Sequence, residues 1–303
     1  MPMSLAQIRA AMQFADPATK HLKDWAWKPL SEVAEKLRVN EIPEYIQRNY
    51  GEFMNKQAAK AAQNELSPRD FIKAYTITQS SIGRGGLPHA TATKGGLKLP
   101  KTNELVRPEG AFAEWLGSPE GQRYLDMAEK GLVDPAVLQR LSQQFAPFGK
   151  QNQLAQSMQY AAENAPAFSS GMNKAVTGSV DDYRNWAEQI KGIAGAKSGF
   201  IGSMLGRGDL PTFDARQINL HTAGESPVGF SSLMNRGRGA GAREAVDRLA
   251  ARQSALDLGV DPSLKPHYQH LTHHAVWDDV GNSQTTHDDL VRAMLGYNEG
   301  GRV

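Results

Sequence analysis

The sequence predicts an all-α fold, and three observations lead to that prediction. Apolar residues recur every three to four positions along most of the 303-residue chain, which is the spacing of one helix face. The alternation of apolar and polar residues that is typical of strands is almost absent. The 29 Gly and 16 Pro residues mostly punctuate the helical stretches, so we expect short helices joined by turns.

The helices can be justified one after another along the chain. A helix over 67–78 begins well, because Ser67 can cap it, Pro68 suits the first helical position and Asp70 lies in the first turn. The stretch 240–257 is the clearest amphipathic pattern of the set. The predicted helices span 43–62, 67–78, 109–117, 119–130, 135–144, 150–164, 181–191, 240–257 and 286–295, and two more contain Phe200 and begin at Pro266.

Three regions are expected. Residues 1–80 form an N-terminal helical region, 81–108 a basic loop rich in Gly and Pro, and 109–303 a helical domain. The loop carries Arg84, Lys94 and Lys98, and no acidic residue lies between 84 and 101. It could follow a DNA backbone, because lysines release counterions on binding, or it could be a connector folded over its own domain.

Composition excludes several classes of protein. The chain has no cysteine, which rules out a disulfide scaffold, a thiolate zinc finger, an iron–sulfur cluster and a cysteine nucleophile. The formal charge of +2 argues against coating nucleic acid by bulk charge alone. No run of about 18 apolar residues and no signal-peptide core occurs, so we expect a cytoplasmic protein without a membrane partner. We also expect a monomer.

The most informative stretch is 191–216, KGIAGAKSGFIGSMLGRGDLPTFDAR. It predicts a helix, a tight glycine hairpin formed by Gly192, Ile193, Ala194 and Gly195, an apolar helix, a loop, and then Asp214. Backbone N–H groups of such a turn can bind a phosphate at a helix N-terminus. The same glycines are also compatible with a plain helix–turn–helix corner.

Lys197 follows this hairpin, and Asp214 comes 17 residues later, after Pro211. This order resembles the helix-hairpin-helix DNA glycosylases, above all the 8-oxoguanine glycosylases with a lysine and an aspartate. The resemblance covers roughly residues 181–222. It departs from the family pattern where Ile190 and Lys191 stand in place of Leu-Pro, and Gly-Ile-Ala-Gly stands in place of Gly-x-Gly, which leaves the register of Lys197 open by one position.

The resemblance implies a helical glycosylase-like fold and an enzyme of DNA repair that excises a modified or damaged base. Lys197 would be the nucleophile that forms a Schiff base and gives abasic-site lyase activity, and Asp214 would be the catalytic carboxylate. The hairpin would bind DNA phosphates, with a monovalent cation held by its carbonyls and no other cofactor required. Arg207 and Arg216 would hold the distorted DNA backbone. Taken singly, Lys197 could also be a solvated lysine and Asp214 a helix cap.

Charge is distributed unevenly along the chain, and this distribution supports DNA binding. Between Lys191 and Arg243 there are seven basic and three acidic residues, whereas 251–303 contains four basic and seven acidic ones. A basic middle and an acidic tail are therefore combined in the near-neutral total. Ordinary fluctuation of surface charge would give the same pattern. A non-enzymatic helical DNA-binding or scaffold protein remains the alternative function.

Histidines gather near the C-terminus. On a helix that begins at Pro266, His267, His270 and His274 would share one face, with Asp278 a turn further on. Imidazoles at this spacing could bind zinc, which would suit a metalloenzyme, but three turns of one helix diverge from a single point. We therefore expect no metal site, and a helix that packs Tyr268, Leu271 and Trp277 while exposing its histidines.

Overall fold

The structure is a computed structural model, and it confirms the all-α prediction for the residues that it describes. Helices make up most of these residues and no strand occurs among them. No helix within the described part is long and apolar enough to cross a membrane. The described residues are 28–36, 42, 44, 47–82, 115–145, 151–193, 195–212, 217, 220–221, 240–256 and 258–281.

The chain divides into two compact units. Unit 1 contains the described residues of Met1–Gly51, Val180–Ser203 and Arg207–Asn282, and unit 2 those of Glu52–Ser179 and Met204–Gly206. The expected division into 1–80, 81–108 and 109–303 stays a prediction, because residues 83–114 lie outside the described part of the chain.

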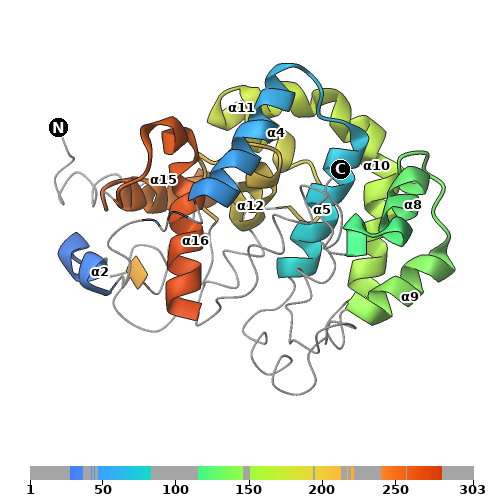
Figure 1. Ribbon diagram of the computed structural model, residues 1–303, viewed down its shortest axis with the longest axis horizontal. Coiled ribbons are helices and arrows are strands. Elements are labelled where there is room, and N and C mark those ends of the chain that lie inside the picture. Colours follow the sequence, from blue (N-terminus) through green and yellow to red (C-terminus); the bar gives the residue numbers. More distant parts are fainter. Residues whose placement is uncertain are drawn as a thin grey trace. The chain divides into compact units, whose positions relative to one another are not determined.

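Unit 2 is built around a long helix. This helix, α10, packs against its neighbours α4, α5, α8 and α9 (Figure 1). Aromatic rings fill the space between α5 and α10: Phe71 stacks on Phe168 at 5.4 Å and Tyr75 lies 5.4 Å from Tyr160. The helices are α4 (Glu52–Ala62), α5 (Pro68–Ile82), α8 (Pro119–Ala128), α9 (Pro135–Phe145) and α10 (Gln151–Thr177).

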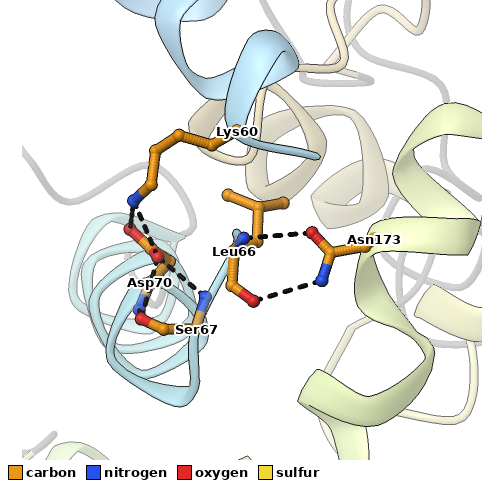
Figure 2. A network of polar contacts seen from close by, with 5 residues as sticks. All are labelled: Lys60, Leu66, Ser67, Asp70 and Asn173. Carbon is orange, nitrogen blue, oxygen red and sulfur yellow. Dashed lines mark hydrogen bonds and ion pairs between the residues drawn. The ribbon is translucent and has the colours of Figure 1, made fainter. Parts of the chain in front are cut away.

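The predicted cap of α5 is confirmed. The Asp70 N–H donates to the Ser67 hydroxyl at 3.4 Å, and the Asp70 carboxylate accepts the Ser67 N–H at 2.9 Å, which is the reciprocal arrangement of a capping box. Figure 2 shows how Lys60 and Asn173 complete this corner. Lys60 pairs with Asp70 at 2.8 Å, and the Asn173 amide accepts the Leu66 N–H and donates to the Leu66 carbonyl. A connection between α4 and α5 is thereby fixed to α10.

α10 is longer than expected, because the prediction ended this helix at 164 and the structure continues it to Thr177. Pro166 lies inside the helix and is exposed. A proline removes one hydrogen bond of the helix, here the one to the carbonyl of Ala162. Burial of Ala161, Ala165 and Met172 on the opposite side outweighs that loss.

Unit 1 consists of shorter elements. The prediction of one helix over 43–62 is wrong in detail, since a π-helical turn, η2 (Gln47–Gly51), precedes α4; a Cβ at Gly51 would lie 2.7 Å from the Leu264 side chain. α2 was not predicted. The other elements are α2 (Leu30–Lys36), α11 (Val180–Ala187), α12 (Gly195–Met204), α15 (Ala240–Ser254), η3 (Pro262–His267) and α16 (Tyr268–Gly281).

Two ion pairs join α11 to α15 within unit 1. Arg184, itself buried, donates to Asp247 at 2.5 Å. Arg243 donates to Glu188 at 3.0 and 3.1 Å, just beyond the end of α11. Because each carboxylate lies where a guanidinium can reach it, the start of the predicted hairpin is held at a fixed place on α15.

Candidate active site

The predicted corner between two helices is present. α11 ends at Ala187, and the chain turns through 188–193 before α12 begins at Gly195. Gly192 has φ +78°, a conformation that side chains disfavour, so the turn requires a glycine there. Whether this corner is the hairpin of the DNA glycosylases stays a prediction.

Hydrogen bonds and packing within the turn use part of its predicted phosphate-binding surface. The Ile193 side chain is fully buried, and its N–H donates to the Ile190 carbonyl at 3.1 Å. Lys191 and Gly192 are exposed. Of the two hairpin residues whose exposure the structure describes, Gly192 is therefore better placed than Ile193 to meet a phosphate, while Ala194 lies outside the described residues.

Lys197 lies in the first turn of α12 and is half-buried. The three residues that follow it, 198–200, are all buried. Burial lowers the pKa of the Lys197 amine from its usual 10.5 to about 8. Desolvation disfavours the ammonium form, so a large share of this side chain is a neutral amine near pH 8. A neutral amine is the form that attacks an electrophilic carbon.

The loop after α12 approaches the helix backbone very closely. A Cβ at Gly199 would lie 2.4 Å from the Pro211 carbonyl oxygen, and one at Gly208 would lie 2.7 Å from the Cα of His267. Both positions therefore admit only glycine without a backbone shift. The loop that leads to Asp214 is therefore held between α12 and η3. At Gly199 the backbone of this loop contacts the backbone of α12, the helix that carries Lys197, with no side chain between them.

Arg207 begins this loop and is buried. Its guanidinium donates to both carboxylate oxygens of Asp209, at 2.8 and 2.9 Å, and lies 5.2 Å from the centre of the Tyr183 ring. The side chain is thus engaged inside unit 1. The predicted contact of Arg207 with DNA stays a prediction, and it would require the guanidinium to leave these partners.

Other predicted site residues lie outside the described part of the chain. They are Asp214, Arg216, Arg84, Lys94 and Lys98. The last described residue before Asp214 is Thr212, which is buried, and its hydroxyl has no hydrogen-bond partner among the described residues. The distance between Lys197 and Asp214 therefore stays a prediction.

The expectation that α16 exposes its histidines is wrong. His270, His273 and His274 are at most 3% exposed, because α16 is covered by η2, η3 and α15. His267 lies in η3 and is buried as well. Burial lowers the pKa of His267, which opposes its protonation.

The buried histidines contact one another instead of a common point. The Nε2 atoms of His270 and His274 are 2.6 Å apart, and the His274 ring stacks on Tyr50 at 4.0 Å. At 2.6 Å the two nitrogens can share a proton. No group of three or more potential metal ligands occurs in the described residues, so the weak metal candidates His267, His270 and His274 gain no third partner there.

Sequence reasoning missed Tyr183, Gly199, Gly202 and Gly208. The spacing of Gly199 and Gly202, three residues apart on one helix face, was the signal that could have predicted a close approach of backbone.

Comparisons with known proteins found no matching family model, no similar curated protein and no similar solved structure.

Proposed function

We propose that the chain is a DNA glycosylase that excises a modified or damaged base and cuts the resulting abasic site through a Schiff base on Lys197. One observation carries the proposal: burial at the start of α12, directly after a glycine turn, lowers the pKa of the Lys197 amine to about 8. A lysine in ordinary solvent would be almost fully protonated at that pH and a poor nucleophile.

The chemistry follows from the neutral amine. Its lone pair attacks C1′ of the sugar, and the N-glycosidic bond breaks with its electron pair leaving on the base, which takes up a proton. The sugar ring opens to give a Schiff base, and loss of a C2′ proton then expels the 3′ phosphate. The carboxylate of Asp214 would stabilise positive charge on the sugar in the first step.

Two observations support DNA binding: the positive charge of the segment that contains the turn, and the exposure of the turn itself. The segment Lys191–Arg243 has a net charge of +4, and Lys191 and Gly192 are exposed at the turn before α12. A phosphate at this turn would bring the sugar of the same strand near the first turn of α12. The target nucleotide would have to leave the base stack, because its glycosidic bond is shielded within a duplex.

Borohydride trapping tests the proposal. The protein is incubated with abasic DNA and borohydride, which reduces a Schiff base to a stable covalent link. We expect the intact chain to be trapped and Lys197→Gln to lose trapping by at least about 100-fold, because the nucleophile is gone. Lys73→Gln is the matched control, since burial also lowers the pKa of Lys73, in unit 2.

A failure to trap the intact chain, together with the absence of any base release that depends on Asp214, contradicts the enzyme. Salt-sensitive DNA binding that persists in Lys197→Gln and Asp214→Asn would then favour the alternative, a helical protein that uses the turn for phosphate contact only. Equal loss of trapping in Lys73→Gln would mean that the effect comes from altered folding.

A further inference from the structure

Tyr183 occupies a central position in unit 1 that the proposed chemistry does not yet use. It is fully buried in α11, and its hydroxyl donates to the Ser198 carbonyl at 2.6 Å. Burial raises the pKa of Tyr183, so its hydroxyl stays protonated and remains a donor at every physiological pH. Ser198 directly follows Lys197, so this bond holds the first turn of α12 to α11.

Gly202 makes this hydrogen bond possible. A Cβ at position 202 would lie 2.7 Å from the Tyr183 hydroxyl oxygen and 3.0 Å from the ring carbon that carries it. The phenol therefore meets the α12 backbone one turn beyond Ser198 as well. Contact at two successive turns fixes both the rotation and the depth of α12 against α11.

Tyr183 also contacts the loop. The Arg207 guanidinium lies 5.2 Å from the centre of the ring, and the Arg207 N–H donates to the Gly202 carbonyl at 2.8 Å. Asp209 holds the guanidinium from the side with two hydrogen bonds. Aromatic faces attract guanidinium groups, so the ring connects α12 with the loop that precedes Asp214.

We propose that Tyr183 is a positioning residue for Lys197: its hydroxyl fixes the helix turn that carries the lysine, and its ring fixes the loop that leads to Asp214. A role in catalysis rests on the proposed function. The effect on the lysine itself does not, because the depth of the amine in unit 1 depends on where the first turn of α12 lies.

The experiment measures the amine directly. Lys197 is labelled with formaldehyde and cyanoborohydride over a range of pH, and its peptide is quantified by mass spectrometry. In Tyr183→Phe the turn is no longer held and the amine gains water, so we expect the labelling midpoint to rise by about one pH unit, with labelling at pH 8 reduced about fivefold. Tyr124→Phe is the matched control, because that buried hydroxyl in unit 2 has no hydrogen-bond partner among the described residues.

A second variant covers the case in which Tyr183→Phe does not fold. Asp209 is 42% exposed, so Asp209→Asn changes a surface group while it loosens Arg207. We expect a shift in the same direction, about half as large in pH units. Asp126→Asn is its control, since Asp126 is 59% exposed and pairs with Arg69 in unit 2.

The outcomes separate this inference from the proposed function. Unchanged labelling profiles in both Tyr183→Phe and Asp209→Asn overturn the positioning role. If the intact chain traps abasic DNA and Tyr183→Phe traps it at the same rate, the enzyme stands and the positioning role falls. If labelling shifts but the intact chain traps nothing, the positioning of the amine holds and the proposed function falls.

Discussion

The two compact units bury different kinds of side chain. Between α5 and α10, unit 2 stacks aromatic rings, and its buried hydroxyls of Thr76 and Thr78 donate to carbonyls within their own helix. In unit 1, α16 buries imidazoles, and Gln217 links His273 to Gln253. All buried histidines among the described residues belong to unit 1.

This difference has a chemical meaning. An aromatic core gains stability from area and shape, and neither changes with pH. A core of imidazoles and amides gains its stability only while each group keeps one protonation state and its hydrogen bonds. Between pH 5 and pH 7, where imidazoles titrate, we therefore expect the stability of the unit that contains Lys197 to depend on protons more than that of unit 2, and three predictions test this contrast.

The largest expected effect is on the aromatic core of unit 2. Phe71 is fully buried and stacks on both Tyr75 and Phe168. Phe71→Ala should lower the free energy of opening of α5 by about 4 kcal/mol, because it removes buried area and leaves a cavity. Hydrogen exchange of α5 amides, corrected for intrinsic rates, measures this loss.

The loss from Phe71→Ala should be the same at pH 7 and pH 5. Met127→Ala is the control, since Met127 is 47% exposed and should cost under about 0.5 kcal/mol. A loss that grows at low pH would break the contrast, because it would tie the stability of unit 2 to titrating groups.

The next effect is acid destabilisation of unit 1. Burial, with the nearby charges of Arg252 and Lys28, lowers the pKa of His221 to about 3, and burial lowers that of His267. The folded state then binds fewer protons than the unfolded state below pH 6.5. The stabilising effect is complete above that pH and is lost progressively as the pH falls, by about 2 kcal/mol from His221 between pH 7 and pH 5.

Hydrogen exchange checks this acid effect by comparing α16 with α5 at the two pH values. Protection of α16 should fall at pH 5 and that of α5 should not. Equal protection of α16 at both pH values would contradict the lowered histidine pKa values, and parallel loss in α5 would mean that the units do not respond separately.

The smallest effect concerns a polar contact in unit 2. Asn173→Leu removes both hydrogen bonds to Leu66, whose N–H and carbonyl lie beside a buried side chain. The cost should be about 1.5 kcal/mol, independent of pH between 5 and 7, because the lost partners carry no charge. Urea unfolding at the two pH values measures it.

Asn164→Leu is the control on the same helix, since among the described residues the Asn164 amide donates to the Tyr160 carbonyl of α10 itself. It should cost less than Asn173→Leu. Equal costs would show that the connection between α4 and α5 gains nothing from α10.

Local chemistry explains what the sequence could predict. The cap of α5 was predictable because Ser67, Pro68 and Asp70 lie within one turn, and the all-α class followed from spacing alone. The corner before Lys197 was predictable because glycines favour turns through their own backbone conformation, without distant contacts. The length of α10 was not, since Pro166 is outweighed by packing with helices distant in sequence.

What was missed depends on tertiary contact. The burial of His270 and His274 depends on Tyr50, more than 200 residues earlier, and on the coverage of α16 by several elements. The proposed role of Tyr183 depends on its hydrogen bond to the Ser198 carbonyl, and the types of residue in a sequence do not reveal which backbone carbonyl a side chain will meet. The spacing of residue types predicts which side chains share one face of a helix. Which elements cover that face is determined only by contacts within the folded unit.

The contact at Gly199 has a consequence for which substitutions unit 1 can accept. There the α12 backbone meets the Pro211 carbonyl with no side chain between them. Side chains adapt to ligands by changing rotamer, but two touching backbones have no such freedom. The spacing of helix and loop is thus set by the main chain itself, so any side chain at position 199 could be accommodated only by moving the loop.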